Sequence, residues 1–177
     1  HNAKNAETFG VELDVKKNLD FIGLRGLSFV CNAAYIYSRV RFEEGAPERD
    51  RPLAGQSPYL VNAGFFYQYD DKGISASLLY NRIGKRIESV GVPMQNQDED
   101  IPDIYEMPRN SLDLTFSKKI GKIVEIKAGI QDMLNSKVEY KQFVKLTDDK
   151  GGKSEREQLI RSYRPGVDIN VGVSLRF

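Results

Sequence analysis

Side chains able to carry out covalent chemistry are scarce in this sequence of 177 residues. The only histidine is His1 and the only cysteine is Cys31, so neither a catalytic triad built on them nor a histidine zinc site can be assembled. Gly84 and Gly121 each precede a lysine, but both lack the upstream glycine of a phosphate-binding loop. We therefore predict that the protein is not an enzyme and needs no cofactor, and we interpret Cys31 as a small apolar strand residue.

Two charged clusters remain as candidate binding sites. Asp98, Glu99, Asp100 and Asp103 could offer oxygen ligands to a calcium ion, but the glycine and terminal glutamate of a calcium loop are missing, which favours a solvated loop. A basic series could attract an anionic ligand or lipid phosphates, although intervening acidic residues neutralise much of its charge. The members of the basic series are Lys150, Lys153, Arg156, Arg161 and Arg164. The sequence therefore assigns no metal and leaves the ligand-binding residues unknown.

The composition sets further bounds on partners. The chain has 26 basic and 25 acidic residues and a net charge of +1, so we predict no nucleic-acid partner. An average of 40% hydrophobic and 29% charged residues is typical of a soluble protein, but a transmembrane barrel with alternating apolar and polar residues has a similar average. No apolar run approaches the ~18 residues of a spanning helix.

The elements that must position these residues are strands, because the dominant period is two. The clearest apolar series consists of Val167, Ile169, Val171, Val173, Leu175 and Phe177. Polar residues and Gly172 alternate with this series. A strand of this length reaches about 36 Å at ~3.3 Å per residue, which is enough to cross a bilayer at a tilt.

The same alternation predicts strands near residues 9–15, 27–37, 59–69, 74–80, 112–116, 124–130 and 138–146. Short turns are expected at 70–73, 119–122 and 132–136, where glycine, aspartate and asparagine favour hairpins. Longer connections are expected at 43–57, 87–109 and 147–164. We therefore predict an all-β fold in one domain spanning residues 1–177, an antiparallel transmembrane β-barrel segment of about eight strands.

Three features favour an apolar face that meets lipid. Phe177 places an aromatic residue after an alternating strand, as is common in outer-membrane barrels. Tyrosines gather toward strand ends, where an amphipathic ring is stable at headgroup depth. Charges in mid-strand on the opposite face suit a wet lumen, although the outside of a soluble barrel would suit them equally. These charges are Glu12, Asp14, Asp113, Glu125, Lys127 and Asp168.

Five short segments follow one another along the chain: ETFGVEL at 7–13, LAGQSPY at 53–59, PRNSLDL at 108–114, AGIQDMLN at 128–135 and YRPG at 163–166. In this order they resemble the last strands of TonB-dependent outer-membrane receptors. The fourth segment departs from the family's Asn-Leu-Phe-Asn/Asp turn, because Asp132 replaces the first asparagine and Met133-Leu134 replaces Leu-Phe. In the fifth, Val167 stands where arginine is usual.

The resemblance implies a C-terminal portion of a barrel of about 22 strands, without the plug domain and the earlier strands. It implies a bacterial outer-membrane location and a role in the uptake of a scarce nutrient, such as a metal chelate or glycan. Expected partners are outer-membrane lipid, the plug domain, TonB and an unknown nutrient ligand. The terminal strand, from Val167 to Phe177, would serve as the assembly signal.

The resemblance also sets an orientation, because the last residue of such receptors lies on the periplasmic side. Counting back places residues 147–164 outside the cell and residues 132–136 in the periplasm. The same count puts the long connection 87–109 in the periplasm, where connections are usually short. This conflict indicates either that part of the connection extends the flanking strands or that the strand count is off by one.

Two alternatives stay open at this point. One is a self-contained eight-stranded outer-membrane barrel with an adhesive or structural role. The other is a soluble lipid-binding barrel whose apolar face points inward around a cavity. A piece of a larger barrel would have two open edges, so on its own it should close on itself or aggregate.

Overall fold

The computed structural model describes residues 3–94, 100–147 and 153–176. In these residues the fold is all-β and antiparallel, as predicted, and holds eleven strands in two sheets with no α-helix. The larger sheet comprises β1 (Asn5–Asn18), β2 (Leu27–Arg41), β3 (Tyr59–Tyr69), β4 (Ile74–Ile83), β7 (Arg109–Ile120), β8 (Val124–Gln131) and β11 (Asp168–Leu175), in that order. The smaller sheet has the order β10 (Lys153–Tyr163), β9 (Val138–Thr147), β6 (Ile104–Glu106) and β5 (Arg86–Ser89).

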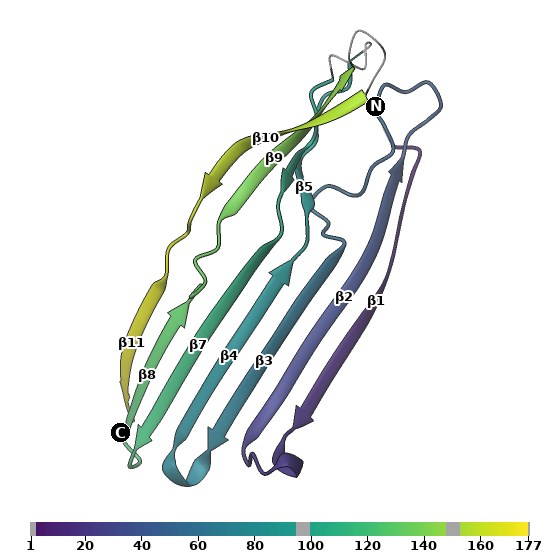
Figure 1. Cartoon of the computed structure of the whole chain (residues 1–177). Coiled ribbons are helices and arrows are strands. Elements are labelled where there is room, and N and C mark those ends of the chain that lie inside the picture. Colours follow the sequence, from purple (N-terminus) through teal and green to yellow (C-terminus); the bar gives the residue numbers. More distant parts are fainter. Residues whose placement is uncertain (1–2, 95–99, 148–152, 177) are drawn as a thin grey trace.

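The smaller sheet extends the larger one (Figure 1). In the larger sheet Ile83 is opposite Arg109, and beyond the break Arg86 is opposite Glu106, so the register of β4 and β7 continues unchanged into β5 and β6. In the same way β9 follows the line of β8, and β10 leads into β11. The two sheets therefore form one long ribbon of strands, and side-chain faces can be followed from one sheet into the other.

The hairpin predicted at residues 132–136 is wrong. Strands β8 and β9 are not paired with each other, and β9 continues in the direction of β8. Asp132 and Asn135 have φ angles of 53° and 44°, and the Asn135 amide donates to the Asp132 carbonyl. Asp113 accepts from the Asp132 amide at 2.8 Å, and Arg109 forms an ion pair with Asp132. These contacts hold a tight kink against β7 instead of reversing the chain.

Because the chain does not reverse at residues 132–136, the connection 87–109 no longer has to lie at the end that has the short turns. The connection 87–109 contains β5 and β6, and the connection 147–164 contains β10. All three long connections now lie at one end of the sheet, which we call the long-connection end (Figure 1). The opposite, short-turn end holds the turns after β1, β3 and β7, with the one-turn 3-10 helices η1 (Asp20–Ile22) and η2 (Asp70–Lys72) in the first two.

The ribbon has almost no internal core. Among the described residues, the buried hydrophobic side chains are Val40, Ile87 and Val138. The first two are covered where the returning arm of the connection 42–58 runs between β2 and β5. There the Arg51 amide donates to Val40, and the Gly55 amide donates to the Ile87 carbonyl at 2.8 Å. Strands β1 and β11 lie at opposite edges, and no pairing joins them in the described part of the chain.

Candidate binding surfaces and cleft

One face of the larger sheet is apolar across all seven strands, and it carries exposed apolar side chains on every strand except β8, where they are half-buried. The registers align alternating residues of neighbouring strands, for example Val15 with Cys31, Cys31 with Ala63, and Ala63 with Tyr80. We call this surface the apolar face. Its most exposed side chains include Val11 at 75% and Val171 at 73%. Further exposed members are Phe9, Leu13, Tyr35, Phe65, Leu78, Phe116, Ile169, Val173 and Leu175. Soluble monomers rarely present so extended an apolar patch to water.

The opposite, polar face is crossed by hydrogen bonds between neighbouring strands. Ser75 bonds Ser117 at 2.8 Å, Ser77 bonds Thr115 at 2.7 Å, and Asn81 donates to Asn62 at 2.6 Å. Asn32 donates to both Glu12 and Asp14. The mid-strand charges predicted for this face all lie on it by register, although Phe66 and Leu79 share it. The donors and acceptors of these side chains that are not used between strands stay available to water or to a polar partner.

Tyrosines border the apolar face at both ends, as predicted. Tyr35 pairs with Tyr59 toward the long-connection end, and Tyr67 and Tyr69 lie toward the short-turn end. Along β3, Tyr59 and Tyr67 are about 27 Å apart at ~3.4 Å per residue. A membrane barrel strand tilted by ~40° would project this length onto about 21 Å, close to the ~25 Å apolar band of outer-membrane barrels. The tyrosine spacing is thus compatible with a bilayer.

The polar face carries a cleft of about 400 Å³ at the long-connection end. Its aromatic wall is formed by Tyr105 and Phe143, whose ring centroids are 5.8 Å apart in an edge-to-face arrangement. Charged residues from two connections and from β9 and β10 complete the lining. They are Glu48, Arg49, Asp50, Arg51, Asp100, Asp103, Lys145 and Glu155. The combination of apolar rings with both signs of charge suits a small polar ligand that has an apolar part.

Lys85 supports the aromatic wall of the cleft. Its ammonium nitrogen lies 4.0 Å from the centroid of Tyr105 and 3.9 Å from that of Phe143, which is close cation–π geometry. Burial lowers the pKa of Lys85, and the carboxylates of Glu155 and Glu157 partly oppose that effect. Burial and the nearby Asp103 raise the pKa of Tyr105, which keeps its hydroxyl protonated at neutral pH. The ammonium group of Lys85 therefore holds the rings of Tyr105 and Phe143 in place.

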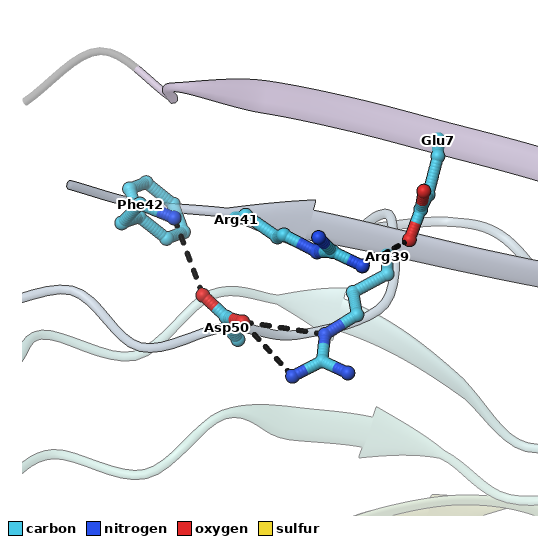
Figure 2. A network of polar contacts seen from close by, with 5 residues as sticks. All are labelled: Glu7, Arg39, Arg41, Phe42 and Asp50. Carbon is cyan, nitrogen blue, oxygen red and sulfur yellow. Dashed lines mark hydrogen bonds and ion pairs between the residues drawn. The ribbon is translucent and has the colours of Figure 1, made fainter. Parts of the chain in front are cut away.

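The connection that forms one side of the cleft is anchored to β2 by a polar network (Figure 2). Asp50 accepts from the Phe42 amide at 3.2 Å and from two nitrogens of Arg39 at 3.2 and 2.9 Å. The Phe42 hydrogen bond, followed by the Arg39 interaction, lowers the pKa of Asp50. On the same strand, Arg41 forms an ion pair with Glu7 of β1 at 2.7 Å. Asp50 thus ties the far arm of the connection to the strand from which the connection departs.

The predicted acidic cluster is divided between two roles. Asp100 forms an ion pair with Arg49, and Asp103 accepts from the Gly91 amide at 2.8 Å and the Tyr105 hydroxyl at 3.4 Å. Asp98 and Glu99 lie outside the described residues. Within the described ranges, no group of three histidine, cysteine or acidic residues is placed to hold a metal ion. Asp100 and Asp103 line the cleft and support its walls through the contacts above.

The predicted basic series is dispersed by the structure. Arg161 stacks on Tyr140 and Tyr163, with its guanidinium carbon 4.1 and 5.6 Å from their centroids. Arg164 donates to the Asn135 carbonyl at 2.6 Å and supports the kink between β8 and β9. Arg156 lies on β10, while Lys150 and the side chain of Lys153 lie outside the described residues.

The predicted terminal strand forms β11, which pairs with β8 at the edge of the larger sheet. Ile169, Val171, Val173 and Leu175 lie on the exposed apolar face, Val167 precedes the strand, and Phe177 lies outside the described residues. Its role as an assembly signal stays a prediction. Sequence reasoning missed the arrangement of Lys85, Tyr105 and Phe143, because only the strand pairing brings these distant residues together.

In the described residues, no helix has the length and hydropathy needed to cross a membrane. Comparison of the chain with family models, with curated proteins and with solved structures finds no match.

Proposed function

We propose that this chain forms part of the wall of an outer-membrane transport barrel of the TonB-dependent receptor type, which takes up a scarce nutrient such as a metal chelate or glycan. The observation that carries this proposal is the apolar face, which spans seven strands, is largely exposed and has almost no core beneath it. Lipid is the surrounding in which such a face is stable, because apolar surface is driven out of water. The polar face then lines the lumen.

The two ends of the sheet support an orientation within this proposal. Outer-membrane barrels have short periplasmic turns and longer extracellular loops. The long connections and the cleft would therefore face the outside of the cell, where a nutrient is first met. The cleft lies on the lumen side, so a ligand bound there would be positioned for passage through the barrel.

Strand direction favours further strands over a self-contained barrel. In an antiparallel sheet of seven strands the two edge strands run in the same direction, as β1 and β11 do (Figure 1). Closing the ribbon on itself would require a parallel pairing, whereas bacterial outer-membrane barrels are antiparallel with an even number of strands. Additional strands between β1 and β11 would satisfy both edges.

Detergent binding tests this proposal. We expect the full chain to stay dispersed only with detergent, and sedimentation in matched-density solvents to reveal a bound detergent belt. A monodisperse chain that binds no detergent would contradict the membrane assignment. A saturable uptake of an apolar dye by that detergent-free monomer would instead support the soluble lipid-binding alternative.

A further inference from the structure

The two ends of the apolar face carry different cations. Register places six arginines on this face or its extension at the long-connection end. They are Arg39 and Arg41 on β2, Arg82 on β4, Arg86 on β5, and Arg156 and Arg161 on β10. The short-turn end instead has mainly lysines, namely Lys17 on β1, Lys72 in η2 and Lys118 on β7, with Arg25 in the turn before β2. Arginine and lysine are not interchangeable in anion recognition, so the two ends of the face differ in how they can bind an anion.

Three of the six arginines are neutralised by carboxylates. Asp50 pairs with Arg39, Glu7 with Arg41 and Glu106 with Arg86. Within the described residues, Arg82, Arg156 and Arg161 form no ion pair. The set of six arginines and three carboxylates therefore has an excess of positive charge, and that excess is located at these three side chains.

Aromatic rings lie against two of the three unpaired guanidinium groups, those of Arg82 and Arg161. The carbon of Arg82 lies 5.9 Å from the centroid of Tyr59, its Nε donates to the Tyr59 hydroxyl at 3.2 Å, and its Nη1 donates to Asn110 at 2.7 Å. Arg161 is exposed and lies over Tyr140 and Tyr163. The Arg161 guanidinium, stacked on Tyr140, keeps nitrogen donors at its edge in the forked geometry that matches two oxygens of a phosphate. Arg82 already uses Nε and Nη1 and has Nη2 left as a donor for an anion.

Their position gives the depth at which such an anion would lie. Arg82 lies two residues after Tyr80, where the apolar residues of β4 end toward the long-connection end. Arg161 lies on the same face and still farther toward that end. In a membrane this depth is that of the lipid headgroups. Building on the proposed function, we propose that Arg82 and Arg161 bind the phosphate of membrane lipids in the leaflet on the long-connection side.

Energy transfer in micelles tests this proposal. A donor dye on Cys31, the only cysteine, would report binding of acceptor-labelled phosphatidic acid or of acceptor-labelled diacylglycerol, which lacks the phosphate. We expect the full chain to prefer phosphatidic acid, and the double variant Arg82→Gln/Arg161→Gln to bind it about tenfold more weakly, the loss expected for removing charge-assisted hydrogen bonds. Binding of diacylglycerol should not change.

The matched control is Lys17→Gln/Lys118→Gln, which removes the same charge from the short-turn end. Equal weakening by both double variants, or no preference for phosphatidic acid, would overturn the lipid-phosphate site while leaving the membrane assignment intact. Displacement of phosphatidic acid by millimolar inorganic phosphate would reveal a site for a free anion and would also overturn it. No energy transfer from either lipid would contradict the proposed function itself. Circular dichroism would establish that both variants keep their strand content.

Discussion

Asn62 and Ala63 are neighbours on β3, yet they belong to surfaces of opposite character. Asn62 accepts a hydrogen bond from Asn81 on the polar face, whereas Ala63 lies between Cys31 and Tyr80 on the apolar face. Neither surface is covered by a second layer in the described residues, since the buried hydrophobic side chains are confined to three positions. In most proteins an internal core determines where apolar residues are stable. In this sheet, the surroundings of each face have that role.

The largest expected effect comes from placing a charge on one face or the other. Ala63→Arg should destabilise the protein in lipid vesicles by about 2–4 kcal/mol if Ala63 faces the bilayer midplane. Asn62→Arg, one residue away, should cost only about 1 kcal/mol, because its side chain stays in water and only the hydrogen bond from Asn81 is lost. Urea unfolding in vesicles would measure both values. Equal costs at the two positions would show that the faces do not differ in their surroundings.

A smaller effect is expected from the ladder on the polar face. Asn81→Leu leaves Asn62 without its cross-strand donor and should cost about 1 kcal/mol. The paired variant Asn62→Leu/Asn81→Leu should recover part of that loss, because no polar group is then left unpaired. A double-mutant cycle in the same unfolding assay would isolate the coupling. Additive costs would mean that this hydrogen bond contributes nothing to the polar face.

Acidification should affect the connection 42–58 before either face of the sheet. The pKa of Asp50 is lowered in the folded protein, so its stabilising contribution is present above the unfolded carboxylate pKa of about 3.9. That contribution is lost as the pH falls through the lower pKa of the folded state. Hydrogen exchange should therefore show the connection opening first in this window. Asp50→Asn should abolish the step, and a step that persists in this variant would assign it to another group.

The alternation of residues predicted the strands of the larger sheet well, and the reason lies in the two faces. Where one face is apolar and the other polar along the whole strand, as on β11, side chains alternate strictly. β10 was missed because its sequence, KSEREQLIRSY, has no alternating apolar face. In the proposed orientation β10 lies outside the headgroup region, where water would reach both faces of the strand. Apolar and polar residues then have no reason to alternate. β5 and β6 were missed for a related reason, since they are short and mix charged with apolar residues.

The error at residues 132–136 has a different origin. Aspartate and asparagine adopt positive φ angles both in hairpins and in kinks, so turn residues alone do not fix the direction of the next strand. The outcome depends on contacts made by Arg109 and Asp113, which lie on another strand. The cleft was unpredictable for a similar reason. Its wall requires the pairing of Ile87 with Tyr105 and of Tyr105 with Lys141, which no local pattern encodes.

Two adjacent positions on β2 test the central claim most directly. A nitroxide on Cys31 would report the apolar face, and a nitroxide on Asn32→Cys in a Cys31→Ser background would report the polar face. In vesicles we expect the first label to be relaxed mainly by oxygen, which concentrates in lipid, and the second mainly by a water-soluble nickel chelate. Equal access of the chelate to both labels would contradict the assignment of the apolar face to lipid.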